Sequence, residues 1–218
     1  MMAGEIYPDS DFADAEIIFV MGGPGAGKST LCARLAEDLG LIHLCPGEML
    51  REFEYTGPLG VWYVVKEAMD EGKLCPIGLI MYLLQAQILR HMKHGARAFL
   101  IDGFPRSTDQ FFDFSRHTQY CKVKFALHIK CSPMTMYHRF TKLALADQIP
   151  PSSSLEKVED EFQKRIDQFS EENMQIIGYL DSIRKVVTID SELLLEESYA
   201  AVREAVEVNL AEVRQEDV

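Results

Sequence analysis

The sequence predicts an α/β fold in which a five-stranded parallel sheet lies between two layers of helices. Five short apolar runs recur along the chain, and stretches with helical spacing separate them. That alternation is typical of parallel sheets, because each strand returns through a helix. The runs occupy residues 16–21, 41–44, 98–101, 123–129 and 186–189. With 218 residues, the chain suits one α/β domain with insertions.

A glycine-rich loop follows the first run. Residues 22–30, Gly-Gly-Pro-Gly-Ala-Gly-Lys-Ser-Thr, match the pattern G-x-x-x-x-G-K-[ST]. Glycines let successive backbone N–H groups point at phosphate oxygens, and Lys28 and the positive end of the next helix attract the same anion. Leucines spaced four apart over residues 31–39 predict that helix, and Gly40 ends it. Strand, loop and helix together indicate a nucleotide site.

The stretch between the second and third strands is longer than a simple crossover. It contains two candidate helices, at residues 59–70 and 78–93, with a break at 72–76. We therefore expect an inserted subdomain here.

Two further helices are predicted between the fourth and fifth strands. Residues 135–146 fit a helix, which the Ile-Pro-Pro-Ser-Ser-Ser loop at 149–154 ends. Residues 155–180 fit one long amphipathic helix with acidic residues at its start. A last helix follows the fifth strand, and the chain becomes polar from about residue 212.

Composition argues against several classes of partner. The formal net charge of −12 disfavours a surface for nucleic-acid backbone, which needs many Lys and Arg contacts. No apolar run is long enough for a membrane span, and the acidic start does not resemble a signal peptide. The 5 cysteines contain no C-x-x-C pair, so they predict neither a zinc knuckle nor a disulfide framework. We expect a cytoplasmic monomer.

A second motif lies at the carboxyl end of the third predicted strand, where ligands of open α/β sheets bind. Residues 99–106 read Phe-Leu-Ile-Asp-Gly-Phe-Pro-Arg. Together with the loop at 22–30, this motif resembles the nucleoside monophosphate kinases, the family of adenylate kinase and UMP-CMP kinase. Two segments strengthen the resemblance: 47–51, Gly-Glu-Met-Leu-Arg, and 71–76, Glu-Gly-Lys-Leu-Cys-Pro, look like the family's G-[DE]-L-L-R and E-G-x-x-V-P.

The resemblance runs from about residue 17 to 210 and implies a three-layer α/β/α P-loop kinase fold. It implies an acidic N-terminal tail over 1–15 and a kinase domain over 16–214. Within the domain, the insert that binds the nucleoside monophosphate covers about 45–76, and a short lid covers about 142–158. The implied activity is transfer of the γ-phosphoryl group of ATP, bound with Mg²⁺, to a nucleoside monophosphate.

The same resemblance assigns roles to individual residues. It implies catalytic roles for Lys28, Arg106, Arg139 and Arg165. It implies ATP contacts from Gly25, Ala26, Gly27, Lys28, Ser29, Thr30 and Arg139. The implied acceptor contacts are Arg51, Lys73, Leu74, Cys75, Gly103, Phe104, Pro105, Arg106, Gln110 and Arg165. Mg²⁺ is expected at Ser29 and, through water, at Asp102.

The acceptor base is indicated by Gln110. The adenylate kinases place a glutamine there against the adenine edge of AMP, whereas many UMP-CMP kinases have asparagine. A glutamine amide both donates and accepts hydrogen bonds, so it can also pair with a pyrimidine. AMP is the preferred acceptor on this pattern, and CMP and UMP remain open.

The lid departs from the family pattern. Arg139 and Arg165 match family arginines, but Ser154 and either Leu143 or Ala144 stand where lid arginines belong. Loss of an arginine that stabilises transition-state charge costs about a thousandfold in rate or more. The alternative is therefore a catalytically weakened nucleotide-binding domain that acts as a sensor or assembly subunit, and a third possibility is a P-loop kinase with another small acceptor.

Two smaller expectations concern other residues. Ser29 stands where the family usually has glycine, but it restores the general G-K-[ST] pattern, so nucleotide binding should be retained. His43, His128 and His138 have no carboxylate or serine at a telling spacing, so no general-base role is expected of them.

Overall fold

The structure is a computed structural model that describes residues 12–56, 59–70, 73–117, 122–148 and 155–216. Its centre is a five-stranded parallel sheet of order β2-β3-β1-β4-β5. The strands are β1 (Glu16–Met21), β2 (Ile42–Leu44), β3 (Ala98–Asp102), β4 (Lys122–Lys130) and β5 (Val186–Asp190). The predicted sheet is confirmed, and every predicted strand end lies within about one residue of the observed end.

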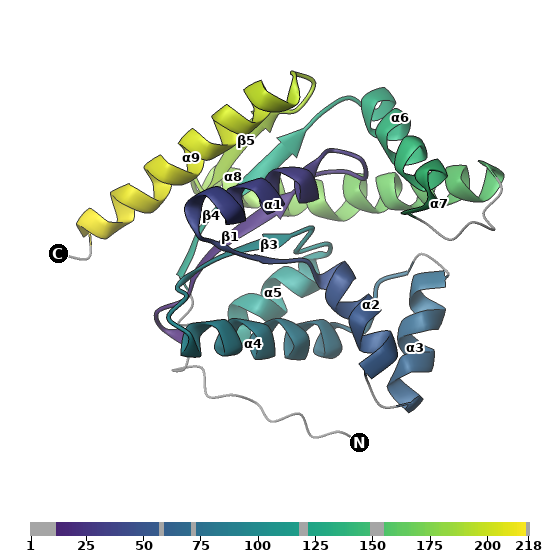
Figure 1. Cartoon of the computed structure of the whole chain (residues 1–218), viewed down its shortest axis with the longest axis horizontal. Helices are drawn as coiled ribbons and strands as arrows, with labels where there is room; N and C mark the ends of the chain where they lie inside the picture. Colours follow the sequence, from purple (N-terminus) through teal and green to yellow (C-terminus); the bar gives the residue numbers. More distant parts are fainter. Residues whose placement is uncertain (1–11, 57–58, 71–72, 118–121, 149–154, 217–218) are drawn as a thin grey trace.

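Helices cover both faces of the sheet, because side chains of a strand alternate between its faces. Ile17 and Phe19 of β1 belong to one buried cluster, while Ile18 and Val20 belong to the other. The first cluster is closed by α4 (Ile77–Lys93), α5 (Thr108–His117) and α8 (Met174–Ser182). The second is closed by α1 (Lys28–Leu39) and α9 (Leu195–Glu216) (Figure 1). The three-layer α/β/α architecture is thus confirmed.

The inserted subdomain contains α2 (Pro46–Thr56) and α3 (Leu59–Asp70), which lie at the end of the molecule remote from α9 (Figure 1). The prediction of two helices between β2 and β3 was incomplete, because α2, α3 and α4 all lie there. No helix was predicted over residues 46–56. In the structure proline occupies the first helical position, where its missing N–H is not needed, and Glu48 follows in the first turn.

The long helix predicted at residues 155–180 is present but not uniform. It consists of α7 (Leu155–Gln168), a π-helical turn η3 (Phe169–Asn173) and α8. A π turn holds an extra residue, so it rotates the side chains that follow relative to those before. Phe162 accordingly packs in the α1/α9 cluster, whereas Ile176 packs in the cluster on the other face.

The other predicted helix of this region is α6 (Pro133–Leu143), which continues as the π-helical η2 (Ala144–Gln148). It packs against α7 through aromatic rings: the ring centroids of Phe140 and Phe162 are 5.5 Å apart, and those of Tyr137 and Phe162 are 5.3 Å apart. The expected lid at 142–158 includes residues 149–154, so Ser154 and the proline-serine stretch lie outside the described residues.

The folded domain begins earlier than the expected boundary at residue 16. Phe12 is fully buried in the α4/α5/α8 cluster, and Ala15 N donates to Phe12 O at 2.9 Å. The acidic Asp14 between them obscured this anchor in the sequence. Across the described ranges, no helix has both the length and the apolar character that a membrane span requires.

Candidate active site

The glycine-rich loop joins β1 to α1 at the carboxyl edge of the sheet. Gly25 and Gly27 adopt left-handed backbone conformations, with φ of 75° and 92°. The first helical hydrogen bond runs from Leu31 N to Gly27 O at 3.1 Å, so the N–H groups of residues 28–30 precede the helical ladder. The loop therefore directs backbone N–H groups and a positive helix end toward one point, as phosphate binding requires.

Gly25 has a second reason to be glycine. A Cβ atom at this position would lie 2.3 Å from the backbone oxygen of Met136 in α6. Neither the left-handed φ nor this contact leaves room for a side chain. The loop thus takes its shape partly from α6, which is more than a hundred residues away in sequence.

Lys28 turns back over its own loop. Its Nζ donates to Gly22 O at 2.9 Å and to Gly23 O at 2.8 Å. Burial lowers the pKa of Lys28, while the nearby carboxylate of Asp102 acts to raise it. The loop therefore carries a buried positive charge beside its N–H groups.

The Asp-Gly-Phe-Pro-Arg turn lies beside this loop because β3 pairs with β1. Gly103 N donates to Val20 O at 2.9 Å, directly before the loop begins. A Cβ atom on Gly103 would lie 3.2 Å from Nη2 of Arg106 and 3.8 Å from Cε of Lys28. Gly103 therefore lies between the two cationic side chains and keeps the space between them open.

Arg106 is fixed from both sides. Its Nε donates to Gly103 O at 2.9 Å, and its backbone N–H donates to Oε1 of Gln110 at 2.8 Å. Gln110 is only 2% exposed, so it is not a solvated helix residue. Since its oxygen already accepts a hydrogen bond, its NH₂ group is the part left to donate.

The π turn η3 supports the same turn from the other side, which the sequence did not indicate. Asn173 is buried and donates from Nδ2 to Pro105 O at 2.7 Å. Glu172 accepts from the backbone N–H and the hydroxyl of Thr108 at 3.1 and 3.2 Å, at the start of α5. A continuous α-helix was predicted here. Its apolar periodicity did not indicate that Glu172 and Asn173 both contact residues 105–108.

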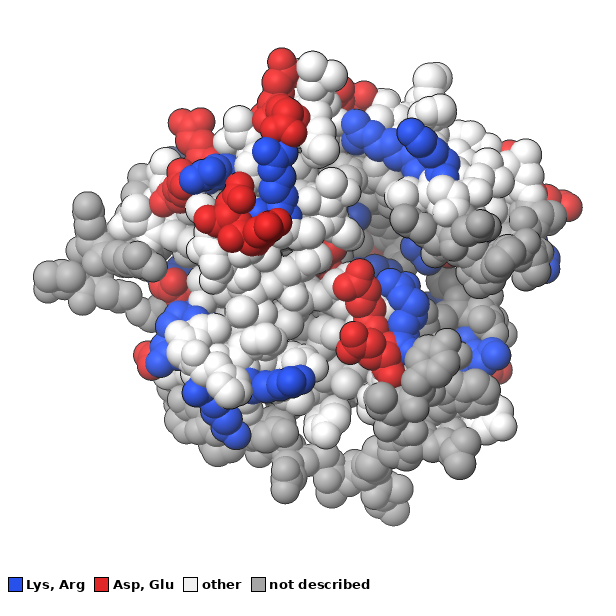
Figure 2. All heavy atoms as spheres, viewed as in Figure 1, with Lys and Arg blue, Asp and Glu red and all other residues white. Residues whose placement is uncertain are grey.

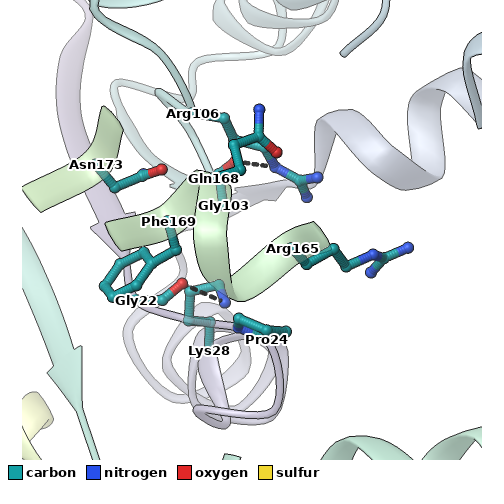
Figure 3. A pocket seen from close by; sticks show the side chains of 9 residues that line it. All are labelled: Gly22, Pro24, Lys28, Gly103, Arg106, Arg165, Gln168, Phe169 and Asn173. Carbon is teal, nitrogen blue, oxygen red and sulfur yellow. Dashed lines mark hydrogen bonds between the residues drawn. The ribbon is translucent and has the colours of Figure 1, made fainter. Parts of the chain in front are cut away.

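A cleft of about 80 Å³ lies between the loop and the turn, and it brings Lys28, Gly103, Arg106 and Arg165 together (Figure 3). Arg106 and Arg165 extend to the same side of this view. The cleft is lined by Gly22, Pro24, Lys28, Gly103, Arg106, Arg165, Gln168, Phe169 and Asn173. Gln168, Phe169 and Asn173 come from the long helix and were not among the expected site residues.

Positive charge converges on this cleft although the chain is acidic overall. Burial and the charges of Arg165 and Arg51 lower the pKa of Arg106. Figure 2 shows basic side chains in and around a hollow on the right side of the molecule. A site where like charges crowd one another is suited to an anion with several negative charges.

A second cleft, of about 240 Å³, adjoins the loop on the α1 side. Arg139 lines it and donates from Nη2 to Ser191 O at 2.8 Å. Its other walls include Ala26, Gly27, Thr30 and Leu31 of the loop and α1, and Leu193 and Leu195 beyond β5. Arg139 is therefore separated from Lys28 and Arg106 by the loop itself, and the apolar walls suit a flat organic group joined to a phosphate chain.

Asp102 lies at the carboxyl end of β3 and is 2% exposed. Nε2 of His43 lies 3.3 Å from its Oδ2. Burial acts to raise the pKa of Asp102, but hydrogen bonds from His43 and Ser29 and the charge of Lys28 outweigh it, so the pKa lies below its ordinary value. Spacing along the sequence gave His43 no carboxylate partner, and the pairing of β2 with β3 supplies one 59 residues away.

The remaining expected acceptor residues differ in their surroundings. The ring of Phe104 packs edge-on against Phe19 and Phe114, so its contribution to a ligand is limited to its backbone. Pro105 is buried beneath the same turn. Burial raises the pKa of Cys75, while the charge of Arg106 acts to lower it, so this thiol lies near the turn. Lys73 is exposed and Leu74 half-buried.

Arg165 is the cation of α7 nearest this cleft. It forms an ion pair with Glu161, one turn earlier, at 2.5 Å, and its guanidinium lies 5.5 Å from the ring centroid of Phe140. Its side chain is 41% exposed. No other arginine occurs between Arg139 and Arg165 in the sequence. The guanidinium of Arg165 is thus bound to the carboxylate of Glu161 in this structure.

Comparisons with known proteins agree with this geometry. The family model described as adenylate kinase matches residues 20–185. A uridylate kinase of Schizosaccharomyces pombe is 34% identical over 177 residues, which are 81% of this chain and 89% of that protein. A uridylate kinase of Saccharomyces cerevisiae is 33% identical, with 89% of this chain and 92% of that protein covered. Adenylate kinase 1 of Schistosoma mansoni is 32% identical, with 84% and 88% covered.

Proposed function

The chain belongs to the adenylate kinase family, and from that premise we propose that it transfers the γ-phosphoryl group of ATP to a nucleoside monophosphate. One observation carries the proposal: Lys28 and Arg106, from two separate motifs, line the same cleft. Phosphoryl transfer needs in-line positioning and positive charge around the migrating group rather than covalent participation by the protein. A cationic cleft between two phosphate-binding corners supplies both.

The donor binds at the glycine-rich loop. The N–H groups of residues 25–30 and the ammonium of Lys28 hold its β- and γ-phosphates. Arg139 and the apolar walls of the second cleft hold its nucleoside. The two clefts share the loop, so one molecule of ATP spans both, with its γ-phosphate toward Arg106.

The acceptor binds at the Asp-Gly-Phe-Pro-Arg turn. Arg106 and Arg165 hold its phosphate, and Arg51 approaches from α2. The backbone of Gly103 and residues 73–75 form the wall on the side of the insert. Gln110 contacts the base edge from behind the turn.

The residues around Asp102 fit Mg²⁺ bound with ATP. The carboxylate of Asp102 and the hydroxyl of Ser29, hydrogen-bonded to each other, offer the oxygen ligands that Mg²⁺ prefers, directly or through water. Mg²⁺ neutralises charge on the donor phosphates when bound. Asp102 and Ser29 orient its hydration shell, and His43 fixes the carboxylate.

The acceptor base is proposed to be adenine first, with cytosine and uracil as alternatives. Adenine N1, cytosine N3 and uracil O4 each accept a hydrogen bond, and the NH₂ group of Gln110 is available to donate. The relatives named uridylate kinase keep UMP among the acceptors to be tested.

The deciding experiment is a coupled assay with ATP and AMP, UMP, CMP or dCMP in turn. Turnover with at least one acceptor should fall by a thousandfold or more, roughly, in Lys28→Ala, because a buried charge on the transferring group is lost. Lys93→Ala, which removes an exposed lysine at the end of α4, is the matched control and should retain full activity.

The alternative of a weakened nucleotide-binding domain has its own outcome. Tight binding of ATP by calorimetry, together with turnover no higher than in Lys28→Ala for every acceptor, would replace the kinase proposal with that alternative. Two observations keep this outcome in view: the Glu161–Arg165 ion pair in α7, and the absence of arginine from residues 142–158 of the sequence.

A further inference from the structure

Three side chains of different chemistry meet beside the glycine-rich loop. Sγ of Cys32, a ring nitrogen of His43 and a carboxylate oxygen of Asp102 all lie within 4.8 Å of one another. Within the described residues, this is the cluster of three or more His, Cys, Asp and Glu side chains that could hold a metal ion. None of the roles proposed above uses the thiol of Cys32.

The three residues come from rigid elements. Cys32 lies in the first turns of α1, His43 in β2 and Asp102 at the end of β3. Cys32 and Asp102 are 0% and 2% exposed, whereas the side chain of His43 is 18% exposed and offers a path from solvent. A site built on helices and strands is held in place before its ligand arrives, which lowers the cost of binding.

The donor set selects the class of metal. One sulfur, one nitrogen and one oxygen form the mixed set that zinc accepts in tetrahedral sites, while Mg²⁺ requires oxygen ligands in an octahedron. In a tetrahedral zinc site, neighbouring ligand atoms are roughly 3.3–3.6 Å apart, given metal–ligand bonds of about 2.0–2.3 Å. The cluster therefore needs a contraction of no more than about 1.5 Å, within the reach of small side-chain rotations.

The local charges are compatible with a divalent ion. A cysteine thiolate and the Asp102 carboxylate together balance its two positive charges, and neutral His43 adds none. Lys28 is a cation that acts on both Cys32 and Asp102, but its Nζ already donates to two loop carbonyl oxygens at 2.8–2.9 Å. The lysine therefore does not need Asp102 as a hydrogen-bond partner.

We propose that Cys32, His43 and Asp102 form a three-ligand site for Zn²⁺ or a similar borderline-soft divalent ion, and that its occupation inhibits the enzyme. Zinc bound here withdraws Asp102 from the oxygen ligands of Mg²⁺ and places a fixed positive charge next to Lys28. With three protein ligands, a tetrahedral ion would need a water molecule as its fourth ligand. The inhibition rests on the proposed kinase function, whereas the binding does not.

Binding is tested on the full chain without nucleotide. Calorimetry with Zn²⁺ alone should give one site per chain. Co²⁺, used as a spectroscopic substitute, should give a thiolate-to-metal charge-transfer band and intense tetrahedral d–d bands. Cys32→Ala should weaken zinc binding at least about 100-fold and abolish the charge-transfer band, because it removes a direct ligand.

Two further variants sharpen the test. Cys131→Ala removes another buried thiol, at the end of β4 and outside the cluster, and should bind zinc as the unchanged chain does. His43→Gln removes a second ligand and serves if Cys32→Ala does not fold, as judged by its thermal unfolding. Zinc binding that survives both Cys32→Ala and His43→Gln, or a Co²⁺ spectrum without a thiolate band, would overturn the site.

The inhibitory part has a separate readout. With excess Mg²⁺ and free zinc fixed by a chelating buffer, zinc should reduce turnover of the unchanged chain and of Cys131→Ala, and Cys32→Ala should resist it. Equal inhibition of Cys32→Ala and the unchanged chain would contradict this part. If no variant turns over any acceptor, the proposed function fails, while the calorimetric result still decides the metal site.

Discussion

At the scale of single residues, the site contains three cationic side chains, each of which contacts an oxygen atom of the protein itself. Arg106 is anchored by Gly103 O, and Lys28 by Gly22 O and Gly23 O. Arg165 is held by a carboxylate. Each of these three cations thus has a partner within the protein, and under the proposed function the Glu161 contact of Arg165 competes with substrate phosphate.

The Glu161–Arg165 ion pair yields a residue-scale prediction. Glu161→Gln should raise kcat/KM by up to about fivefold, because exposed ion pairs are worth about 0.2–1 kcal/mol and the freed guanidinium can meet phosphate. Steady-state kinetics with the best acceptor would measure this change.

Glu156→Gln is its matched control, since it removes the same charge from an exposed position of the same helix. An unchanged or lower kcat/KM in Glu161→Gln would show that the carboxylate does not compete with substrate.

Asp102 gives a prediction of pH dependence. Although burial acts to raise its pKa in the folded protein, the hydrogen bonds from His43 and Ser29 and the charge of Lys28 hold that pKa below its ordinary value. A carboxyl group with a lowered pKa stabilises the fold above its unfolded-state pKa, and that contribution disappears as the pH falls through the folded-state pKa. Asp102→Asn should therefore lose less stability than the unchanged chain on acidification below about pH 4.

Denaturant unfolding of both chains between pH 6 and pH 3, roughly the range in which carboxyl groups titrate, would measure the difference. Asp160→Asn, which removes a carboxylate from an exposed position of α7, is the control and should parallel the unchanged chain. Parallel curves for Asp102→Asn would contradict the lowered pKa.

At the scale of elements, the loop and α6 are one packing unit. Gly25→Ala should destabilise the fold by about 1–2 kcal/mol for the left-handed backbone and by about 1–3 kcal/mol more for the clash with Met136 O. It should also weaken ATP binding, because the loop must move. Denaturant unfolding and calorimetry with ATP would measure the two effects.

Gly40→Ala separates backbone strain from the clash. Gly40 ends α1 with φ of 66°, and no atom lies within 4 Å of a Cβ placed there. This variant should lose only the roughly 1–2 kcal/mol of backbone strain and keep its ATP affinity. Equal losses in the two variants would show that α6 does not constrain the loop.

The elements also show how far sequence reasoning reached. The five strands and the helix 59–70 were predicted because apolar periodicity and glycine breaks are local signals. The helix α2 was not predicted, and it begins with Pro46 and Gly47, two residues of low helix propensity. The π turn η3 was not predicted because it preserves the apolar spacing on either side of it. The ends of strands and helices that local residue types determine were predictable, whereas an extra residue inserted within a helix was not.

The same contrast holds for the site. Lys28, Gly103 and Arg106 could be assigned to one cleft because parallel neighbouring strands bring their carboxyl ends together. The partners His43 of Asp102 and Asn173 of Pro105 depend on strand order and helix phase, which spacing along the chain does not encode. The roles of the site residues in ATP and acceptor binding stay predictions for the variants above.

At the scale of the whole molecule, two arginines beside the cleft that Lys28 and Arg106 line remain exposed to solvent. Arg51 is exposed and Arg165 is 41% exposed, although both lie close enough to Arg106 to affect its pKa. Water must be kept from the reactive phosphate during transfer. We therefore expect α2–α3 and the α6–α7 region to approach each other when both nucleotides are bound.

A bisubstrate dinucleotide polyphosphate should reveal this closure in solution scattering. The radius of gyration should fall toward about 17 Å, the value for a compact chain of this length. Lys28→Ala should show no such decrease at the same concentration. If the analogue does not alter the radius of gyration of the chain without substitutions, the cleft works without closure.

The continuous helical segment from residue 155 to 182, which consists of α7, η3 and α8, carries both Arg165 and the side chain that holds the turn at Pro105. Arg165 lies within α7, and eight positions further along, inside the π turn, the side chain of Asn173 is hydrogen-bonded to Pro105 O. We therefore expect a tilt of α7 to displace the turn at Pro105, because the Asn173–Pro105 hydrogen bond joins the two. If bound ATP raises the affinity for the acceptor by some factor, bound acceptor must raise the affinity for ATP by the same factor.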